Sequence, residues 1–296
     1  MLGYIGPSNK RAQHRMPELP EVETTLRGIA PHVERQKVTA VRLYDRRLRW
    51  PVPSDLPDRL VGRIVDSVER RSKYLLFRLG QDTLIVHFGM TGSMRVYRRA
   101  PALRRHDHID LEFGNGVVLR YHDPRRFGAM LWASGDAGNH PLLAALGPEP
   151  LAQAFDADHL FKATRTRSAA IKLALMDSHL VVGVGNIYAN EALFRAGILP
   201  TRAAKRISRL RLGRLVDAVR HTLTDAIAKG GSTLRDYVDS EGRPGFFQNG
   251  YFVYGRAGEP WMYQDAATRT LLPAPARASS VDCKNSGSGG SSATLC

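Results

Sequence analysis

Seven short apolar segments, closely spaced between residues 37 and 133, constrain the fold of this chain more than any other feature. They comprise residues 37–43, 74–79, 83–88, 93–97, 108–113, 117–122 and 129–133. Their content of Val, Leu, Ile, Phe and Tyr is typical of β-strands, and turn residues separate them. Gly114-Asn115-Gly116 indicates a hairpin between the fifth and sixth segments. Many short strands in this order predict a β-sandwich or a barrel.

Helical spacing of apolar residues precedes and follows this region. The stripe of the first helix comprises Leu19, Val22, Leu26, Ile29 and Val33, and Pro31 marks its end or a kink. Beyond about residue 135 the helical pattern returns over residues 171–176, 187–196 and 205–229, and Gly230-Gly231 ends the last helix. The sequence therefore predicts an α+β fold, with a leading helix and an N-terminal β-sandwich followed by a C-terminal helical domain.

The charge of the chain narrows the class of partner. Lys and Arg number 43 against 28 Asp and Glu, which gives a formal net charge of +15. This excess favours nucleic acid over an anionic membrane surface or a generic basic surface. No stretch approaches about 18 apolar residues, and residues 1–15 lack the apolar core of a secretory signal. With Cys283 and Cys296 as the only cysteines, we expect a cytoplasmic protein without a disulfide framework.

Six motifs occur in a fixed order along the chain. They are MPELPEVET, RRSKYLLFRL, HFGMTGSMR, DPRRFG, LMDSHLVVGVGNIYANEALF and GGSTLRDYVDSEGRPGFF. Over about residues 16–260 they resemble the formamidopyrimidine-DNA glycosylases of the Fpg/Nei family, bacterial excision-repair enzymes for oxidised guanine. HFGMTG and DPRRFG are similar to the Fpg branch rather than the Nei branch.

The resemblance implies a division of the chain into four parts. Residues 1–15 are an extension outside the family pattern, and 16–135 form a catalytic β-sandwich domain. Residues 150–260 form a helical domain that contains a helix-two-turn-helix element and a loop covering the flipped base. Residues 261–296 stand where the family carries its zinc finger.

The implied activity is that of a bifunctional DNA glycosylase and AP lyase. Such an enzyme excises 8-oxoguanine and formamidopyrimidines from double-stranded DNA through a proline Schiff base and β,δ-elimination. The family acts as a monomer in the bacterial cytoplasm, at the nucleoid, and uses no redox cofactor. A Nei-type preference for oxidised pyrimidines stays open within the same enzyme class.

The resemblance assigns the chemistry to Pro17, Glu18 and Lys73, with Glu21 in support. Pro17 is the nucleophile, Glu18 protonates the sugar ring oxygen, and Lys73 contacts the phosphate near the lesion and assists elimination. Without the resemblance, Pro17 would be a first-turn helix proline. Glu18 and Glu21 would be acids favourable to the helix dipole, and Lys73 would be a solvated strand-edge lysine.

Pro17 can act as a nucleophile only when its nitrogen is free. Inside a chain the nitrogen is an amide whose lone pair is delocalised into the carbonyl. Fifteen residues precede Met16 in this sequence. We expect that the true start is Met16, which is then removed. Clipping of the extension, or an inactive chain, are the alternatives.

Four residues of the sandwich are implied in base flipping. The target base must leave the duplex before its sugar can be attacked. By resemblance, Met90, Arg125 and Phe127 fill the gap and read the opposite base, and His87 touches backbone phosphate. Without the family, Met90 and Phe127 would be ordinary core residues, and His87 would be a satisfied strand histidine.

Two residues of the helical domain are implied in phosphate binding. Asn186 follows two glycines and opens a helix, where backbone N–H groups bind anions well. By resemblance Asn186 is a phosphate ligand of the helix-two-turn-helix element, and Lys172 is a second one. GxGN by itself is weak evidence for such a site, whereas the whole motif around it is strong.

The end of the chain departs from the family pattern. The family closes with four cysteines that bind zinc, but Trp261 stands at the expected first cysteine and no histidine follows His221. Cys283 and Cys296 have the wrong spacing, so a tetrahedral zinc site cannot be built from this tail and no metal ligand is assigned. A frameshift or assembly error explains the tail better than a natural zinc-free variant.

Two further functions stay open on the sequence alone. A chain with a blocked Pro17 and no finger could bind damaged DNA without cutting it. A ribosomal or other RNA-binding protein would explain the +15 charge but not the ordered motifs.

Overall fold

The computed structural model describes residues 16–232, 247–256, 262–264 and 271–273, and the chain divides into two compact units, 1–249 and 250–296. Predictions for the extension, for most of the loop over the flipped base and for Trp261, Cys283 and Cys296 lie outside the described residues. In the second unit, β9 (Met262–Gln264) pairs with β10 (Leu271–Pro273) in an antiparallel hairpin.

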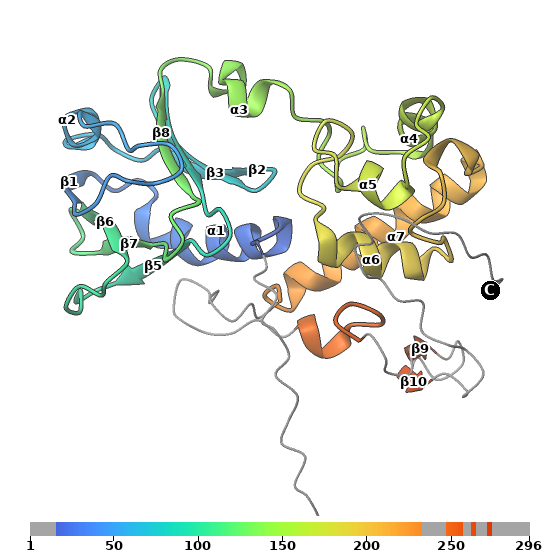
Figure 1. Ribbon diagram of the computed structural model, residues 1–296. Helices are drawn as coiled ribbons and strands as arrows, with labels where there is room; N and C mark the ends of the chain where they lie inside the picture. Colours follow the sequence, from blue (N-terminus) through green and yellow to red (C-terminus); the bar gives the residue numbers. More distant parts are fainter. Residues whose placement is uncertain (1–15, 233–246, 257–261, 265–270, 274–296) are drawn as a thin grey trace, which may run out of the picture. The chain divides into compact units, whose positions relative to one another are not determined.

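Helix α1 (Leu19–Val33) confirms the leading helix predicted from the apolar stripe. Glu18 is its N-cap, and the backbone N–H of Glu18 donates to Oε2 of Glu21 at 2.9 Å. Pro31 lies inside the last turn and the helix ends two residues later. The buried side of α1 packs against β2, β3 and β5 and against α7 of the helical region (Figure 1).

Two antiparallel four-stranded sheets form the β-sandwich, as the sequence predicts (Figure 1). The first has the order β1 (Val38–Leu43), β6 (Asp107–Phe113), β7 (Val118–His122) and β5 (Ser93–Tyr97). The second has the order β2 (Ser67–Arg71), β3 (Tyr74–Leu79), β4 (Asp82–His87) and β8 (Ala129–Ala133). All seven predicted segments are strands, and the Gly-Asn-Gly turn joins β6 to β7. Strand β2 was not predicted from the sequence, because Val68 is its one buried residue among polar neighbours.

The sandwich core contains Phe77, Val86, Leu119 and Tyr121, each at most 1% exposed. Apolar residues of α1 and of the short helix α2 (Leu56–Leu60) extend this core. Fully burying a side chain of this size contributes about 1.5–3 kcal/mol each. The loops at the ends of the strands therefore rest on a rigid base.

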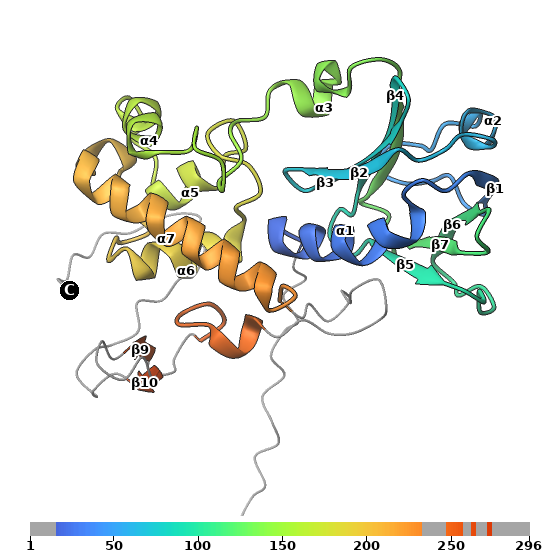
Figure 2. The same cartoon turned by 180° about the vertical axis from the view of Figure 1, so that it is seen from behind.

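The helical region follows a connection that holds α3 (Pro141–Ala144). It contains α4 (Ala157–Thr164), α5 (Ile171–Leu175), α6 (Asn186–Arg195) and α7 (Arg209–Ala228), with a 3-10 helix, η3 (Phe247–Gly250), after the undescribed segment (Figure 2). The last helix begins later than predicted, because the Ser208 side chain caps it and residues 204–206 form a separate 3-10 turn. Gly230 and Gly231 end it with positive φ angles, as expected. Of the helices in the described part, none is long and apolar enough to span a bilayer.

Candidate active site

Glu18 links the sandwich to the helical region. Its carboxylate accepts hydrogen bonds from the backbone N–H groups of Gly185, at 2.8 Å, and Ile187, at 3.0 Å, at the start of α6. A Cβ on Gly185 would lie 2.3 Å from Cδ of Glu18, so glycine is required for this approach. The carboxylate therefore faces the N-terminus of α6, so Glu18 does more than favour the dipole of α1, the helix that it caps. The helix N-terminus and its two N–H donors partly offset the cost of burying the negative charge.

Burial makes Glu18 a carboxyl group that can hold a proton near neutral pH. The residue is 4% exposed, and desolvation is the main reason that the pKa of Glu18 rises to about 7. The positive charge of Lys73 opposes this rise, the negative charge of Glu21 adds to it, and the two backbone donors of α6 lower it. A carboxyl with such a pKa can donate or accept a proton at physiological pH.

Glu21 is a fully buried carboxyl beside Glu18. It accepts hydrogen bonds from the Tyr188 hydroxyl at 2.6 Å and from the backbone N–H of Ser232 at 2.8 Å. Burial raises the pKa of Glu21, although these donors act against the rise. Glu21 thus connects α1, α6 and Ser232, four residues after the end of α7, which is a larger structural role than a first-turn acid would have.

Pro17 and Lys73 lie close to this carboxyl pair. Pro17 is buried and directly precedes Glu18 in the chain. Lys73 sits in the β2–β3 turn, is partly buried, and is the strongest charge acting on Glu18. The structure therefore brings the carboxyl and its neighbouring proline together with a lysine that is 56 positions away from Pro17 in the sequence. Lys73 is not simply a solvated lysine at a strand edge.

A carboxylate in the connection to the helical region holds the turn that carries Lys73. Glu149 accepts from Arg70 Nη1 at 2.7 Å, from Arg71 Nη1 at 2.9 Å and from the backbone N–H of Ser72 at 2.7 Å. Arg71 also donates to the carbonyl groups of residues 146 and 147. Ser72 has a φ of +59°, so this turn is strained and needs such support. Glu149 was not predicted as a site residue from the sequence, although it stands in the Gly-Pro-Glu-Pro connection.

Two loops at one end of the sandwich carry the residues implied in base flipping. Met90 lies in the β4–β5 turn, while Arg125 and Phe127 lie in the β7–β8 loop. The two loops touch through a glycine, because a Cβ on Gly89 would lie 2.3 Å from the carbonyl carbon of Phe127. Gly128 is equally confined, and a Cβ there would lie 1.7 Å from the Tyr121 hydroxyl. This contact brings together the two loops that carry Met90, Arg125 and Phe127, which come from two separate sequence motifs.

Asp123 organises the contact between these loops. Its fully buried carboxylate accepts from the Thr91 hydroxyl at 2.6 Å and from the backbone N–H of Gly128 at 2.8 Å. The Thr91 hydroxyl in turn accepts from the backbone N–H of Arg125 at 3.1 Å. Asp123 fixes the turn that it begins, as its place ahead of Pro124 suggests.

Phe127 is 41% exposed, so its interpretation as a core residue is wrong. The Arg125 guanidinium carbon lies 4.7 Å from the centre of the Phe127 ring. Met90, on the neighbouring loop, is half-buried. An exposed aromatic ring under a guanidinium offers a flat apolar surface and hydrogen-bond donors together, which suits insertion into a base stack.

His87 ends β4, the strand that leads into the loop of Met90. Its Nδ1 accepts from the backbone N–H of Gly89 at 3.1 Å, and its ring lies 4.7 Å from that of Tyr74. Burial, followed by the positive charges of Lys73 and Arg49, lowers the pKa of His87 to about 4. The imidazole is therefore neutral at pH 7, and a donor through Nε2 is what it can offer to a phosphate.

Lys172 and Asn186 lie in the helical region. Lys172 is on α5 and partly exposed, and Asn186 is the exposed first residue of α6. The loop before α6 also supplies the backbone N–H of Gly185 to Glu18. The N-terminus of α6 thus serves a buried carboxylate, while Asn186 beside it stays accessible to solvent.

The residues present do not fit a family-type zinc finger. The whole sequence contains two cysteines, both in undescribed residues, and a four-cysteine site needs two more. Among the described residues, no group of three or more His, Cys, Asp or Glu side chains could hold a metal ion.

Comparison with known proteins identifies both halves of the described chain. Residues 16–130 match the model of the formamidopyrimidine-DNA glycosylase N-terminal domain, and 146–238 match that of the H2TH domain. The formamidopyrimidine-DNA glycosylase of Thioalkalivibrio sulfidiphilus is 58% identical over 257 residues, covering 87% of this chain and 95% of the relative. That of Stutzerimonas stutzeri is 56% identical, covering 82% and 90%.

Solved structures give the same answer. The MutM (Fpg) protein of Thermus thermophilus is 40% identical with a TM-score of 0.74, covering 83% of this chain and 90% of that one. A mutant FPG of Lactococcus lactis, in complex with a Fapy-dG containing DNA, is 30% identical with a TM-score of 0.76, covering 87% and 98%. With both domain models matched and relatives 56–58% identical over most of their length, the chain belongs to the formamidopyrimidine-DNA glycosylase family of base excision repair enzymes.

Proposed function

We propose that this protein excises oxidised purines, 8-oxoguanine and formamidopyrimidines, from duplex DNA and then cleaves the strand as an AP lyase. The observation that carries this proposal is the group formed by Pro17, Glu18 and Lys73. In it a carboxyl with a pKa of about 7 lies next to the residue that bears the nucleophile and under the influence of a lysine. Relatives named for this glycosylase, one of them bound to a lesion-containing DNA, support the substrate class.

The proposed reaction starts with the free secondary amine of Pro17. Its nitrogen attacks the anomeric carbon of the deoxyribose, the glycosidic bond breaks, and the base leaves with the proton that the attacking nitrogen loses. Glu18 protonates the ring oxygen as the sugar opens, which produces an iminium ion between the protein and C1′. The iminium acidifies the neighbouring C2′–H, so loss of that proton expels the 3′-phosphate. A second elimination expels the 5′-phosphate, and water releases the sugar fragment from the amine.

The remaining residues bind DNA in this proposal. Met90, Arg125 and Phe127 fill the space that the flipped base leaves and contact its former partner. His87, Lys172 and Asn186 contact phosphates on the two sides of the lesion. Because His87 is neutral at pH 7, its contact is a hydrogen bond, whereas Lys172 adds a positive charge.

The protein acts as a monomer in this proposal, as the family resemblance implies. No step is assigned to a metal, because the cysteines present do not fit the zinc finger of the family. The division into a catalytic sandwich over 16–135 and a helical domain over 150–260 stays a proposal, in which the site forms where α1 meets α6.

A second candidate function follows from the chain as written. The peptide bond to Met16 acylates the Pro17 nitrogen, and an acylated nitrogen cannot attack a sugar. The full-length chain would then bind damaged DNA without cutting it. We propose that activity appears once Pro17 becomes the first residue.

Borohydride trapping tests both functions. A chain that starts at Pro17 and the full 296-residue chain are each incubated with a duplex containing 8-oxoguanine opposite cytosine, and borohydride is added. We expect a covalent protein–DNA adduct from the first chain and none from the second. An adduct from a full chain whose N-terminus is verified as Met1 by mass analysis would show that another group is the nucleophile. The absence of an adduct from both chains, despite binding, would favour the non-catalytic function.

A further inference from the structure

The β5–β6 loop is a basic segment that the proposed site does not use. Residues 98–105 are all exposed and include Arg98, Arg99, Arg104 and Arg105. No acidic residue occurs anywhere from Ser93 to position 106. The loop therefore concentrates positive charge at one edge of the first sheet.

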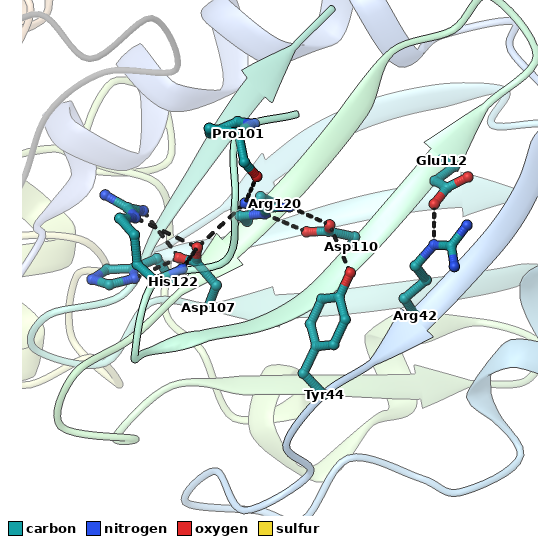
Figure 3. A network of polar contacts seen from close by, with 9 residues as sticks. Arg42, Tyr44, Pro101, Asp107, Asp110, Glu112, Arg120 and His122 are labelled. Atoms are coloured by element: carbon teal, nitrogen blue, oxygen red, sulfur yellow. Dashed lines mark hydrogen bonds and ion pairs between the residues drawn. The ribbon is translucent and has the colours of Figure 1, made fainter. Parts of the chain in front are cut away.

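The middle of this loop is fixed to the sheet by a buried arginine. Arg120 on β7 is 3% exposed and donates from Nη1 to the carbonyl of Pro101 at 2.9 Å (Figure 3). Its other nitrogens bind both carboxylate oxygens of Asp110, each at 2.7 Å. The pair is buried and bidentate, so the carbonyl of Pro101 has a rigid partner.

The end of the loop is fixed by Asp107. Its buried carboxylate accepts from the backbone N–H of Arg104 at 2.8 Å and from Arg104 Nη2 at 3.0 Å. It also accepts from His122 Nδ1 at 2.8 Å (Figure 3). Asp107 therefore compensates the charge of Arg104. Among the described residues, no hydrogen-bond or ion-pair partner is found for the side chains of Arg98, Arg99 and Arg105.

Exposed arginines elsewhere in the described chain are of two kinds: Arg35, Arg206 and Arg214 have no hydrogen-bond or ion-pair partner for their side chains, whereas others pair with acids. Arg27, Arg42 and Arg59 are each more than 40% exposed and each pairs with a carboxylate. A surface that only keeps the protein soluble would be expected to mix both signs in this way. Three arginines without acids, on a loop fixed at two points, instead suit a polyanion.

The loop returns to the end of the sandwich that carries the base-flipping residues. Asp107 and Ser93 both pair with His122, the last residue before the β7–β8 loop. The carbonyl of His106 accepts from the backbone N–H of Asp123 at 3.1 Å. Arg104 and Arg105, at the end of the β5–β6 loop, are thus next to the segment that holds Arg125, whereas Arg98 and Arg99 follow Tyr97, which pairs with Val118 at the other end of β7.

We propose that Arg98, Arg99 and Arg105 bind backbone phosphates of the duplex beside the lesion and so lengthen the stretch of DNA that the protein covers. The inference rests on the proposed function, because it takes duplex DNA as the ligand. Guanidinium groups bind phosphates through paired N–H donors and carry no base preference there. The loop therefore increases affinity for damaged and undamaged duplex alike.

Salt dependence of binding tests the proposal. The full chain and its R98Q/R99Q/R105Q variant are titrated by fluorescence anisotropy against a duplex that holds a tetrahydrofuran abasic analogue, between about 50 and 200 mM KCl. Loss of three phosphate contacts should make the negative slope of log K against log salt shallower by roughly 3. The matched control is K37Q/R206Q/R214Q, which removes three exposed charges outside the loop and keeps the slope within about one of the parent.

The outcomes of this experiment distinguish failure of the loop proposal from failure of the proposed function. An unchanged slope in the loop variant, with its melting temperature intact, overturns the proposal, and so does an equal fall in the control. Loss of affinity for a structured RNA but not for the duplex overturns it in favour of an RNA partner. If the parent chain binds lesion duplex no better than undamaged duplex or RNA, the proposed function fails instead, whatever the loop variant does.

Discussion

The site around Glu18 and the loops around Phe127 differ in which side chains they bury: the first buries carboxyl groups, and the second exposes an apolar ring. Glu18 and Glu21 are acidic groups that are buried, and backbone N–H groups and hydroxyls hold them in place. Phe127 is an apolar ring that is exposed. Acid–base chemistry at neutral pH needs a carboxyl whose pKa burial has raised, whereas insertion into DNA needs an apolar surface that the base stack can reach. Each region therefore breaks the usual rule of burial in the direction that its proposed role requires.

The largest expected effect comes from Glu18→Gln, which removes the proton donor and keeps the shape of the side chain. In a chain that starts at Pro17, we expect excision to fall by roughly 10²–10⁴-fold, the usual contribution of a general acid. Single-turnover excision of 8-oxoguanine measures it, and the control is Glu112→Gln, an acid of β6 that pairs with exposed Arg42. Excision by Glu18→Gln within a factor of about two of the parent would exclude this role.

The effect of Glu18→Gln on stability should depend on pH, which tests the raised pKa of Glu18 independently of catalysis. The folded-state pKa of Glu18, about 7, lies above its ordinary value of 4.5, so the buried carboxyl costs stability as pH rises between these values and the full cost is present above pH 7. The cost is roughly 3 kcal/mol from this shift. Glu18→Gln should therefore raise the melting temperature more at pH 8 than at pH 5. An equal change at both values would contradict a raised pKa.

Gly128→Ala should strongly destabilise the Phe127 loops. Its Cβ would lie 1.7 Å from the Tyr121 hydroxyl and 2.6 Å from the carbonyl oxygen of His87, a backbone atom that cannot move aside. We expect a loss of about 3 kcal/mol or more in the free energy of unfolding. Urea denaturation measures it against Gly114→Ala, where the nearest atom is 3.8 Å away. Similar losses in both variants would mean that the loops do not depend on this close approach.

Glu149→Gln, in the connection between the sandwich and the helical region, should have an intermediate effect on stability. It removes the charge that Arg70 and Arg71 share, in a side chain that is 23% exposed, so we expect a loss of about 1–3 kcal/mol. Excision should fall further than stability alone explains, because the turn that carries Lys73 loses its support. The control is Glu69→Gln, whose side chain is half exposed in its pair with Arg78. A stability loss without a change in the rate of strand cleavage would limit Glu149 to a structural role.

Phe127→Ala should have the smallest effect on stability. The exposed ring contributes little to the core, so the free energy of unfolding should change by about 0.5 kcal/mol or less. Affinity for a lesion duplex should nevertheless fall by roughly tenfold, since an inserted ring is worth about 1–3 kcal/mol per base. Phe88→Ala, at a fully buried position, should cost about 3–5 kcal/mol of stability. A larger loss of stability in Phe127→Ala than in Phe88→Ala would contradict the exposed position of the Phe127 ring.

Local sequence was sufficient to predict seven strands of the sandwich and the leading helix, whereas the residues expected to carry the chemistry came from the family resemblance. Strand and helix periodicity depend on the local spacing of apolar residues, so they can be seen without knowledge of the partner strands. The short polar strand β2 and the late start of α7 could not be predicted in this way, because pairing with β3 and a serine cap decided them.

How those residues work depends on contacts that exist only in the folded chain. Glu18 looks like a first-turn acid until α6 presents its N-terminus to the carboxylate, and Glu149 has no local pattern that marks it as the support for the turn of Lys73. The same holds for Asp123 and the β5–β6 loop, whose partners lie elsewhere in the chain. A pKa, an exposed ring and an ion pair each depend on atoms brought together by folding, and distance along the sequence does not encode that proximity.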